Sequence, residues 1–299
     1  MCCATLEFAV MEQAGTISFC ISGAGEDRAV IDDLMARLRT AQVAAELRPD
    51  VHRPDWSKIT LSKARDVLQR RLIAHPAGVT RWEGLGAGED KALVAILGHF
   101  IRHGRAPSRE AIADSTGQSP DEVQSALESL RRRDLVVLDQ FNASIRAAYP
   151  FAAYSTGHRI TLSGQATDSL CAIDALGAGA MCETESSIDS KCAHCDVPIH
   201  ITTSGGGTAL KAVEPAGTVV WYSLAFDGCV AQSCCPSTQF FCSDDHLAAW
   251  RAGIGARTTG DRLDIHEALE IGVALFEPLL RPGATATTAE RADASGEHG

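Results

Sequence analysis

The alternation of hydrophobic and polar positions divides the chain into segments with different predicted structures. Within residues 1–80, the stretches ATLEFAV and GTISFCI alternate apolar and polar residues on either side of Gly15, which predicts two short strands. Residues 27–47 and 62–75 instead carry apolar residues at helical spacing and predict two amphipathic helices. We therefore expect residues 1–80 to form a small N-terminal unit, whose role the pattern does not indicate.

Residues 86–150 follow a pattern of three helices and a hairpin. The apolar spacing predicts a helix over 89–102, and Ser108 is placed to cap a short helix that ends near Ser115. The sequence Ser-Pro-Asp-Glu at 119–122 is a capping box with proline at the first helical position, and opens a helix to about Arg132. Two strands within 134–151 complete the order of a winged helix-turn-helix.

The charge of this module argues against binding to nucleic acid. A recognition helix presents Arg, Lys or Asn to DNA, whereas the predicted helix begins with Asp121 and Glu122 and continues with Glu128 on its exposed face. The whole chain carries 27 Lys and Arg against 38 Asp and Glu, a net charge of −11. We therefore interpret residues 86–150 as a structural winged-helix-like module.

Residues 158–282 alternate between strand and helix patterns typical of an α+β domain. HRITLSG predicts a strand, and Thr167 or Asp168 can cap a helix that runs to about Met181. Further strands are predicted around AHCDVP and within AVEPAGTVVWYSLAF, and two helices over 244–253 and 264–280. The tail 283–299 is poor in apolar residues, and we expect it to be disordered. The predicted fold class is α+β, with a small N-terminal unit, a winged-helix-like module and a mixed catalytic domain.

The location of the protein decides how its 11 cysteines are interpreted. No apolar run approaches the length of a membrane span, and the N-terminus lacks the features of a signal peptide, so we expect a cytoplasmic protein without membrane contact. The cytosol keeps thiols reduced, which argues against a disulfide framework. Clustered cysteines then indicate soft-metal or redox chemistry.

Two cysteine segments offer such chemistry. Cys171 lies in the first turns of a predicted helix, where backbone N–H groups favour a thiolate, and Asp174 shares its face at i+3. A buried aspartate can carry a proton, although this spacing alone favours a core cysteine beside a surface aspartate. Either member of the adjacent pair Cys234-Cys235 can meet Cys171 across the fold, and two converging thiolates bind a soft, two-coordinate metal ion.

A third segment, Cys192-Ala193-His194-Cys195, has the CxxC spacing of a zinc half-site. The second CxxC that would complete such a site is absent from the sequence. Two of Cys229, Cys234 and Cys235 are the candidates for the remaining ligands. A zinc-stabilised protein without enzymatic activity therefore stays an alternative.

These motifs, in this order, resemble the organomercurial lyase (alkylmercury lyase) family of bacterial mercury resistance over about residues 88–282. The resemblance rests on CAIDAL, SKCAHCDVPI, VEPAG, SCCPSTQFF and DIHEALEIG. It implies a site of Cys171, Asp174 and Cys234 that is both catalytic and mercury-binding, and a structural role for Cys192. The segment differs from the family by one residue after its cysteine pair, where Pro236 follows, so Cys235 stands as the alternative second thiol.

The resemblance implies that two thiolates and an aspartate proton relay cleave a carbon–mercury bond to a hydrocarbon and Hg²⁺. Mercury is then substrate and product, and no cofactor is expected. The implied partners are an organomercurial, low-molecular-weight thiols and mercuric reductase as acceptor of Hg²⁺. A winged-helix metal sensor that binds mercury without cleaving anything is the other alternative. Because the resemblance starts beyond residue 86, we expect a chain that begins near Gly86 to fold and remain active.

Overall fold

The computed structural model describes residues 7–13, 16–22, 54–74, 85–253 and 259–280. The chain divides into two compact units, Met1–Pro49 and Asp50–Gly299. The helix expected over 27–47 and the tail 283–299 lie outside the described residues. In the first unit, β1 (Glu7–Gln13) and β2 (Thr16–Ser22) pair as the antiparallel hairpin that the alternating pattern predicted.

The division at Pro49 differs from the boundary that we expected near residue 80. The helix α2 (Ser62–Ala74) has the predicted span, but it packs on α10 (Ile265–Phe276) in the second unit. Its apolar stripe, which includes Val67 and Leu68, is buried there, and the Glu270 carboxylate accepts hydrogen bonds from the backbone of Thr60 and Leu61. A chain that begins near Gly86 would lose this packing, which speaks against our expectation that it folds and remains active.

The winged-helix-like module has the predicted order of elements. It consists of α4 (Ala87–His103), α5 (Arg109–Thr116), α6 (Pro120–Arg132), β3 (Val136–Leu138) and β4 (Ile145–Ala148). Ser108 caps α5, and Ser119 forms the predicted capping box with Glu122 at the start of α6. The hairpin β3–β4 does not stand alone, because β4 pairs with β5 (Phe151–Ala152) and so extends the main sheet.

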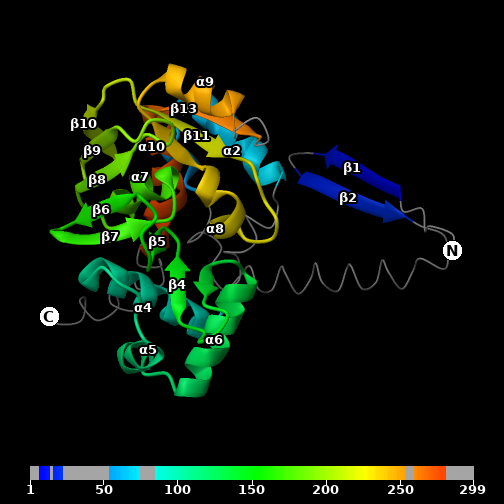
Figure 1. Ribbon diagram of the computed structural model, residues 1–299. Coiled ribbons are helices and arrows are strands. Elements are labelled where there is room, and N and C mark those ends of the chain that lie inside the picture. The colour runs from blue at the N-terminus through cyan, green and yellow to red at the C-terminus, as the bar shows by residue number, and fades with distance from the viewer. Residues whose placement is uncertain (1–6, 14–15, 23–53, 75–84, 254–258, 281–299) are drawn as a thin grey trace, which may run out of the picture. The chain divides into compact units, whose positions relative to one another are not determined.

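The main sheet is antiparallel, with eight strands in the order β10-β9-β8-β6-β7-β5-β4-β3. Its remaining strands are β6 (Arg159–Leu162), β7 (Gln165–Ser169), β8 (Ser186–Lys191), β9 (Pro198–Ser204) and β10 (Ala209–Glu214). A second sheet has the order β12-β11-β13, formed by β11 (Val219–Ser223), β12 (Gln239–Phe241) and β13 (Gly260–Asp264). Figure 1 shows the helices of the winged-helix-like module at one end of this unit and α9 (Asp244–Ala252) at the other.

The helix α7 (Ala172–Met181) occupies the centre of the second unit, and all 10 of its residues are buried. Thr167 and Asp168, which we expected to cap it, lie in β7 instead, because residues 165–169 pair with β5 and β6. Cys171 is the residue that precedes the first helical turn. The two strands and the sharp start of α7 therefore place Cys171 between sheet and helix.

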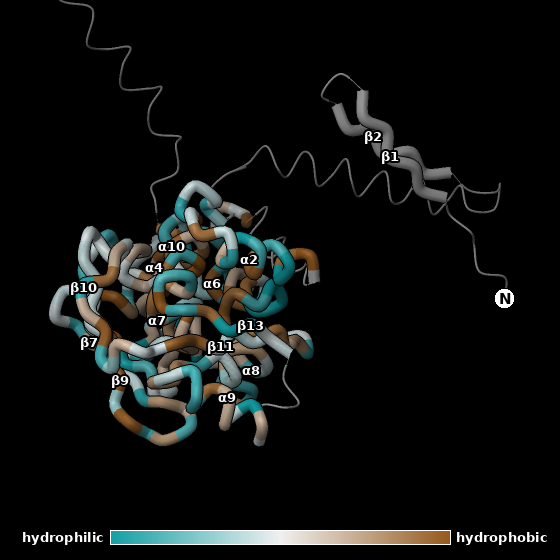
Figure 2. Tube along the Cα trace, turned by 90° about the horizontal axis from the view of Figure 1, so that it is seen from above, coloured by the Kyte–Doolittle hydropathy of each residue, from teal (hydrophilic) through white to brown (hydrophobic). Residues whose placement is uncertain are grey.

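Two glycines allow α7 to lie directly against α10. A Cβ atom on Gly177 would stand 2.4 Å from the carbonyl oxygen of Gly272, closer than any side chain can approach a backbone atom. In Figure 2 brown, apolar segments occur along both helices. The α+β class is confirmed. Within the described residues, no helix combines the length and the hydropathy needed to cross a membrane.

Candidate active site

The start of α7 holds two of the predicted site residues in the interior. Cys171 and Asp174 are 3% and 5% exposed, so the aspartate is not the surface residue that spacing alone allowed. The backbone N–H of Ala172 donates to the carbonyl of Thr238 at 3.2 Å, and this bond joins the start of α7 to the segment that follows the cysteine pair. The i+3 spacing therefore places both functional groups beside that segment.

The structure brings Cys235 to this pair of residues. Its sulfur donates to the Asp174 carboxylate across 3.7 Å, and it also hydrogen bonds to the sulfur of Cys171. The ligand atoms of Cys171, Asp174 and Cys235 all lie within 4.8 Å of one another, and the three side chains are buried. Two sulfurs and a carboxylate thus converge on one point. We refer to these three residues as the thiol–carboxylate cluster.

Cys234 is not part of this cluster, and its sulfur has other partners. Its sulfur lies 3.3 Å from the carbonyl oxygen of Ser223 and 3.5 Å from the hydroxyl of Thr238, and Arg71 donates to it at 2.6 Å. Cys234 has helical backbone angles, and neighbouring side chains in a helical turn point about 100° apart. The two adjacent sulfurs therefore have different hydrogen-bond partners.

Arg71, on α2, is a buried cation beside the cysteine pair that the sequence analysis did not identify. It is 8% exposed, donates to the carbonyl of Ser223, and lies over the Tyr222 ring at 4.0 Å. Burial lowers the pKa of Arg71, but electrostatic attraction to Tyr222 and Cys234 outweighs burial and raises it overall. Arg71 is therefore charged, and it ties α2 to the cysteine segment.

The winged-helix-like module holds the cysteine segment from the other side. The short helix α8 (Val230–Ser233), which precedes the cysteine pair, donates its first backbone N–H groups to Asp134 at 2.9 Å and to the Tyr149 hydroxyl at 2.8 Å. Asp134 follows α6, and Tyr149 follows β4. These contacts agree with a structural role for the module.

Both sulfurs of the thiol–carboxylate cluster favour the protonated form. Burial raises the pKa of the Cys171 thiol to about 11, although the hydrogen bond from Cys235 partly opposes this effect. The pKa of Cys235 is raised well above its usual range, first by that hydrogen bond to Cys171 and then by burial. The cluster therefore holds two thiol protons next to a carboxylate, and a thiophilic metal ion can displace them.

Comparisons with known proteins agree with this arrangement. Residues 151–277 match the alkylmercury lyase (MerB) family model. The match covers the residues that carry the motifs from CAIDAL to DIHEALEIG. The resemblance drawn from the motifs is confirmed over these residues, and so is the class of enzyme that it implied.

A solved structure extends the likeness beyond the alkylmercury lyase region. The chain resembles the mercury-bound form of MerB2 with a TM-score of 0.57 and 24% sequence identity, over 73% of this chain and 100% of that chain. At this identity the comparison shows a shared fold. No curated protein matches the chain.

The zinc half-site predicted beside the lyase residues has different partners from those we expected. Cys192 and Cys195 face Cys242 and His246, and not Cys229, Cys234 or Cys235. Cys229 instead precedes the first turn of α8. Cys242 and His246 are two zinc-ligand residue types four positions apart, and this pairing is the signal in the sequence that could have identified them.

Proposed function

We propose that the chain cleaves the carbon–mercury bond of organomercurials at Cys171, Asp174 and Cys235. The observation that carries this proposal is the convergence of two buried sulfurs and one buried carboxylate within 4.8 Å. The alkylmercury lyase match over residues 151–277 and the fold shared with mercury-bound MerB2 support it. Cys235 takes the role that the family resemblance assigned to Cys234, because its sulfur contacts both partners.

The first step is capture of the substrate by one thiol. An organomercurial reaches the cluster as a thiol adduct, R–Hg–SR′, and the Cys171 sulfur displaces R′S⁻ from mercury. The Cys171 proton leaves with the departing thiolate as R′SH. Sulfur outcompetes nitrogen and oxygen for a soft ion, so mercury binding offsets the raised pKa of the buried thiol.

The second step breaks the carbon–mercury bond. Cys235 transfers its proton to Asp174, across the 3.7 Å contact, and its sulfur binds mercury. Asp174 then delivers that proton to the carbon atom, which takes the electron pair of the carbon–mercury bond and leaves as R–H. Hg²⁺ remains bound by the two sulfurs, and Asp174 is again ionised.

Release of Hg²⁺ requires other thiols. Two low-molecular-weight thiols exchange onto mercury and return their protons to Cys171 and Cys235. Mercuric reductase can accept Hg²⁺ in the same way, through its own thiols. The cycle uses no cofactor, and it requires a compartment such as the cytoplasm in which thiols stay reduced.

The test is hydrocarbon release from phenylmercury in the presence of excess thiol. The wild-type chain should release benzene, and Asp174→Asn should bind mercury at the wild-type stoichiometry while benzene release falls by about 10²-fold or more. Asp189→Asn is the matched control, because Asp189 is an exposed carboxylate that pairs with His200 on the main sheet. No benzene from the wild-type chain, or a normal rate from Asp174→Asn, would contradict the proposal.

A further inference from the structure

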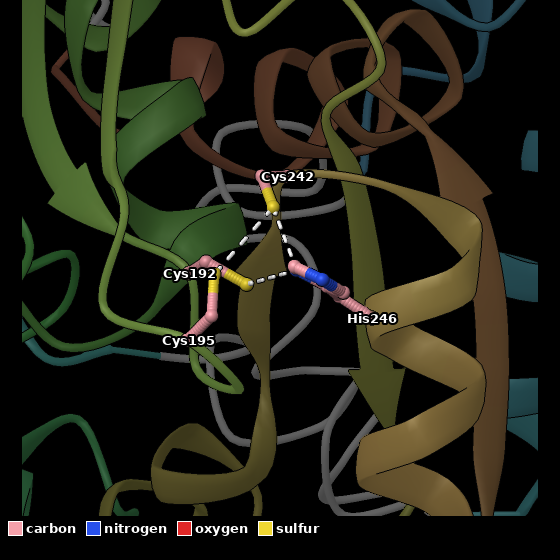
Figure 3. Close-up of side chains that lie close together, drawn as sticks. All are labelled: Cys192, Cys195, Cys242 and His246. Carbon is pink, nitrogen blue, oxygen red and sulfur yellow. Dashed lines mark hydrogen bonds between the residues drawn. The ribbon is translucent and has the colours of Figure 1, made fainter.

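A second cluster of potential metal ligands lies outside the thiol–carboxylate cluster. Cys192 and Cys195 stand in the turn between β8 and β9, Cys242 directly follows β12, and His246 lies in the first turn of α9. Figure 3 shows the four side chains turned toward one another from these three places in the fold. Their ligand atoms all lie within 4.8 Å of one another.

The backbone around this cluster is shaped like a metal-binding turn. Backbone N–H groups of Cys242, His194 and Cys195 donate to the sulfur of Cys192 and hold it in place. The turn closes through the N–H of Cys192 to the carbonyl of Val197 at 2.9 Å, and Asp196 has a left-handed φ of 59°. The turn thus presents both of its sulfurs on one side.

The other two members of the cluster, Cys242 and His246, are held at the start of α9. Ser243 caps α9 by accepting from the backbone N–H of His246, and this cap fixes the imidazole in the first helical turn. Cys242 immediately precedes the cap residue Ser243, so its side chain stands at the start of α9 beside His246. Its sulfur lies 2.9 Å from the Nδ1 atom of His246.

Two of the separations between ligand atoms are close to those around a tetrahedral ion, while the 2.9 Å between Cys242 and His246 would have to lengthen when an ion binds. With zinc–sulfur bonds of about 2.3 Å, two sulfurs of a tetrahedron stand about 3.8 Å apart. The sulfurs of Cys195 and Cys242 are 3.8 Å apart, and the sulfur of Cys192 lies 3.8 Å from the Nδ1 atom of His246. Three sulfurs and one imidazole nitrogen form the donor set of a closed Cys₃His zinc site.

We propose that Cys192, Cys195, Cys242 and His246 bind one structural Zn²⁺. The ion has four protein ligands and no open position, so it performs no chemistry on a substrate. It joins the β8–β9 turn to the end of β12 and the start of α9. The proposal does not depend on the lyase reaction, because the zinc cluster and the thiol–carboxylate cluster share no residue.

The first experiment measures metal in the full-length chain. The protein is purified with a reducing agent and without added metal, and zinc is measured by mass spectrometry. We expect about one zinc per chain in the wild type and in Cys182→Ser, which removes a cysteine at the end of α7 that contributes nothing to the cluster. The pair of substitutions Cys242→Ser and His246→Ala should reduce zinc to less than a tenth of the wild-type content.

The second experiment needs no variant and therefore does not depend on whether a variant folds. Zinc is removed from the wild-type chain with a chelator under reducing conditions, and Co²⁺ is added. The chain should develop the visible absorption of tetrahedral cobalt and the near-ultraviolet bands of sulfur-to-cobalt charge transfer, and Zn²⁺ should abolish both. The proposal would be overturned if the double variant retained zinc, or if the zinc-free wild-type chain failed to develop these bands with Co²⁺. A Cys195–Cys242 disulfide in the reduced protein would overturn it too.

Discussion

Replacing each member of the cysteine pair by serine distinguishes the two sulfurs by position. Cys235→Ser removes the sulfur that lies 3.7 Å from the Asp174 carboxylate, and a hydroxyl is a hard ligand that stays protonated beside a soft ion. The variant loses both the second mercury ligand and the proton that Asp174 passes on. Loss of a positioned proton donor alone typically costs about 10²–10⁴-fold in rate, or roughly 2.7–5.5 kcal/mol in the barrier.

Cys234→Ser makes the same chemical change one residue earlier and should have little effect. The serine hydroxyl can still accept the hydrogen bond from Arg71 and donate to the carbonyl of Ser223, which are the contacts of the Cys234 sulfur. We expect the rate to stay within about threefold of wild type, roughly 0.6 kcal/mol.

The assay is a single turnover of phenylmercury in excess thiol, with benzene measured by gas chromatography. Circular dichroism of each variant shows whether it is folded, and mercury analysis of the same sample shows whether it binds the substrate. A folded Cys234→Ser that loses activity while Cys235→Ser keeps it would refute the assignment. Equal losses in both variants would refute it too, since the two sulfurs face different neighbours.

Three further substitutions test the structure around the site. Arg71→Ala should lower the free energy of unfolding in urea by about 2–3 kcal/mol, because it leaves the buried carbonyl of Ser223 without its charged donor; an unchanged value would contradict this. Gly177→Ala should lower the free energy of unfolding by about 1–3 kcal/mol through the clash with Gly272. An unchanged free energy of unfolding would show that α7 and α10 can move apart. Burial lowers the pKa of His158 from 6.5 to about 4, so its stabilising contribution is complete above pH 6.5 and is lost as the pH falls toward 4. This pKa difference corresponds to about 3 kcal/mol in the free energy of unfolding. The free energy of unfolding of His158→Gln should therefore depend less on pH between 6.5 and 4 than that of the wild type.

Local signals in the sequence were enough to predict the elements that local contacts determine. The capping box at Ser119 and the cap at Ser108 gave α6 and α5 their starts, since these hydrogen bonds form within one turn. The start of α7 was wrong for the opposite reason. Thr167 and Asp168 are good caps in isolation, but their backbone pairs with strands that the local sequence does not reveal.

The same limit applies to the candidate site. The i+3 spacing of Cys171 and Asp174 predicted that they share a helix face. In the structure the two side chains do lie close together, but Cys171 stands just before the first turn of α7 and not on the helix. The orientation of the cysteine pair depends on a short helical turn, whose start the sequence pattern did not indicate. Arg71 lies 163 positions from Cys234 and gave no signal, because only the packing of α2 brings it to the site.

One short strand connects the two clusters of the molecule, and this connection gives the proposed zinc ion a consequence for catalysis. The segment with Cys235 continues through Thr238 into β12 and ends at Cys242. Thr238 accepts from the N–H of Ala172, beside Cys171, at 3.2 Å, and Phe240 accepts from the N–H of Ala193, in the zinc-binding turn, at 3.0 Å. A Zn²⁺ at Cys242 therefore fixes the far end of the segment whose near end carries the second sulfur. A mercury ion that bridges two sulfurs requires both of them in fixed positions. A closed metal site that restrains β12 would also restrain the distance from Cys235 to Cys171 and Asp174.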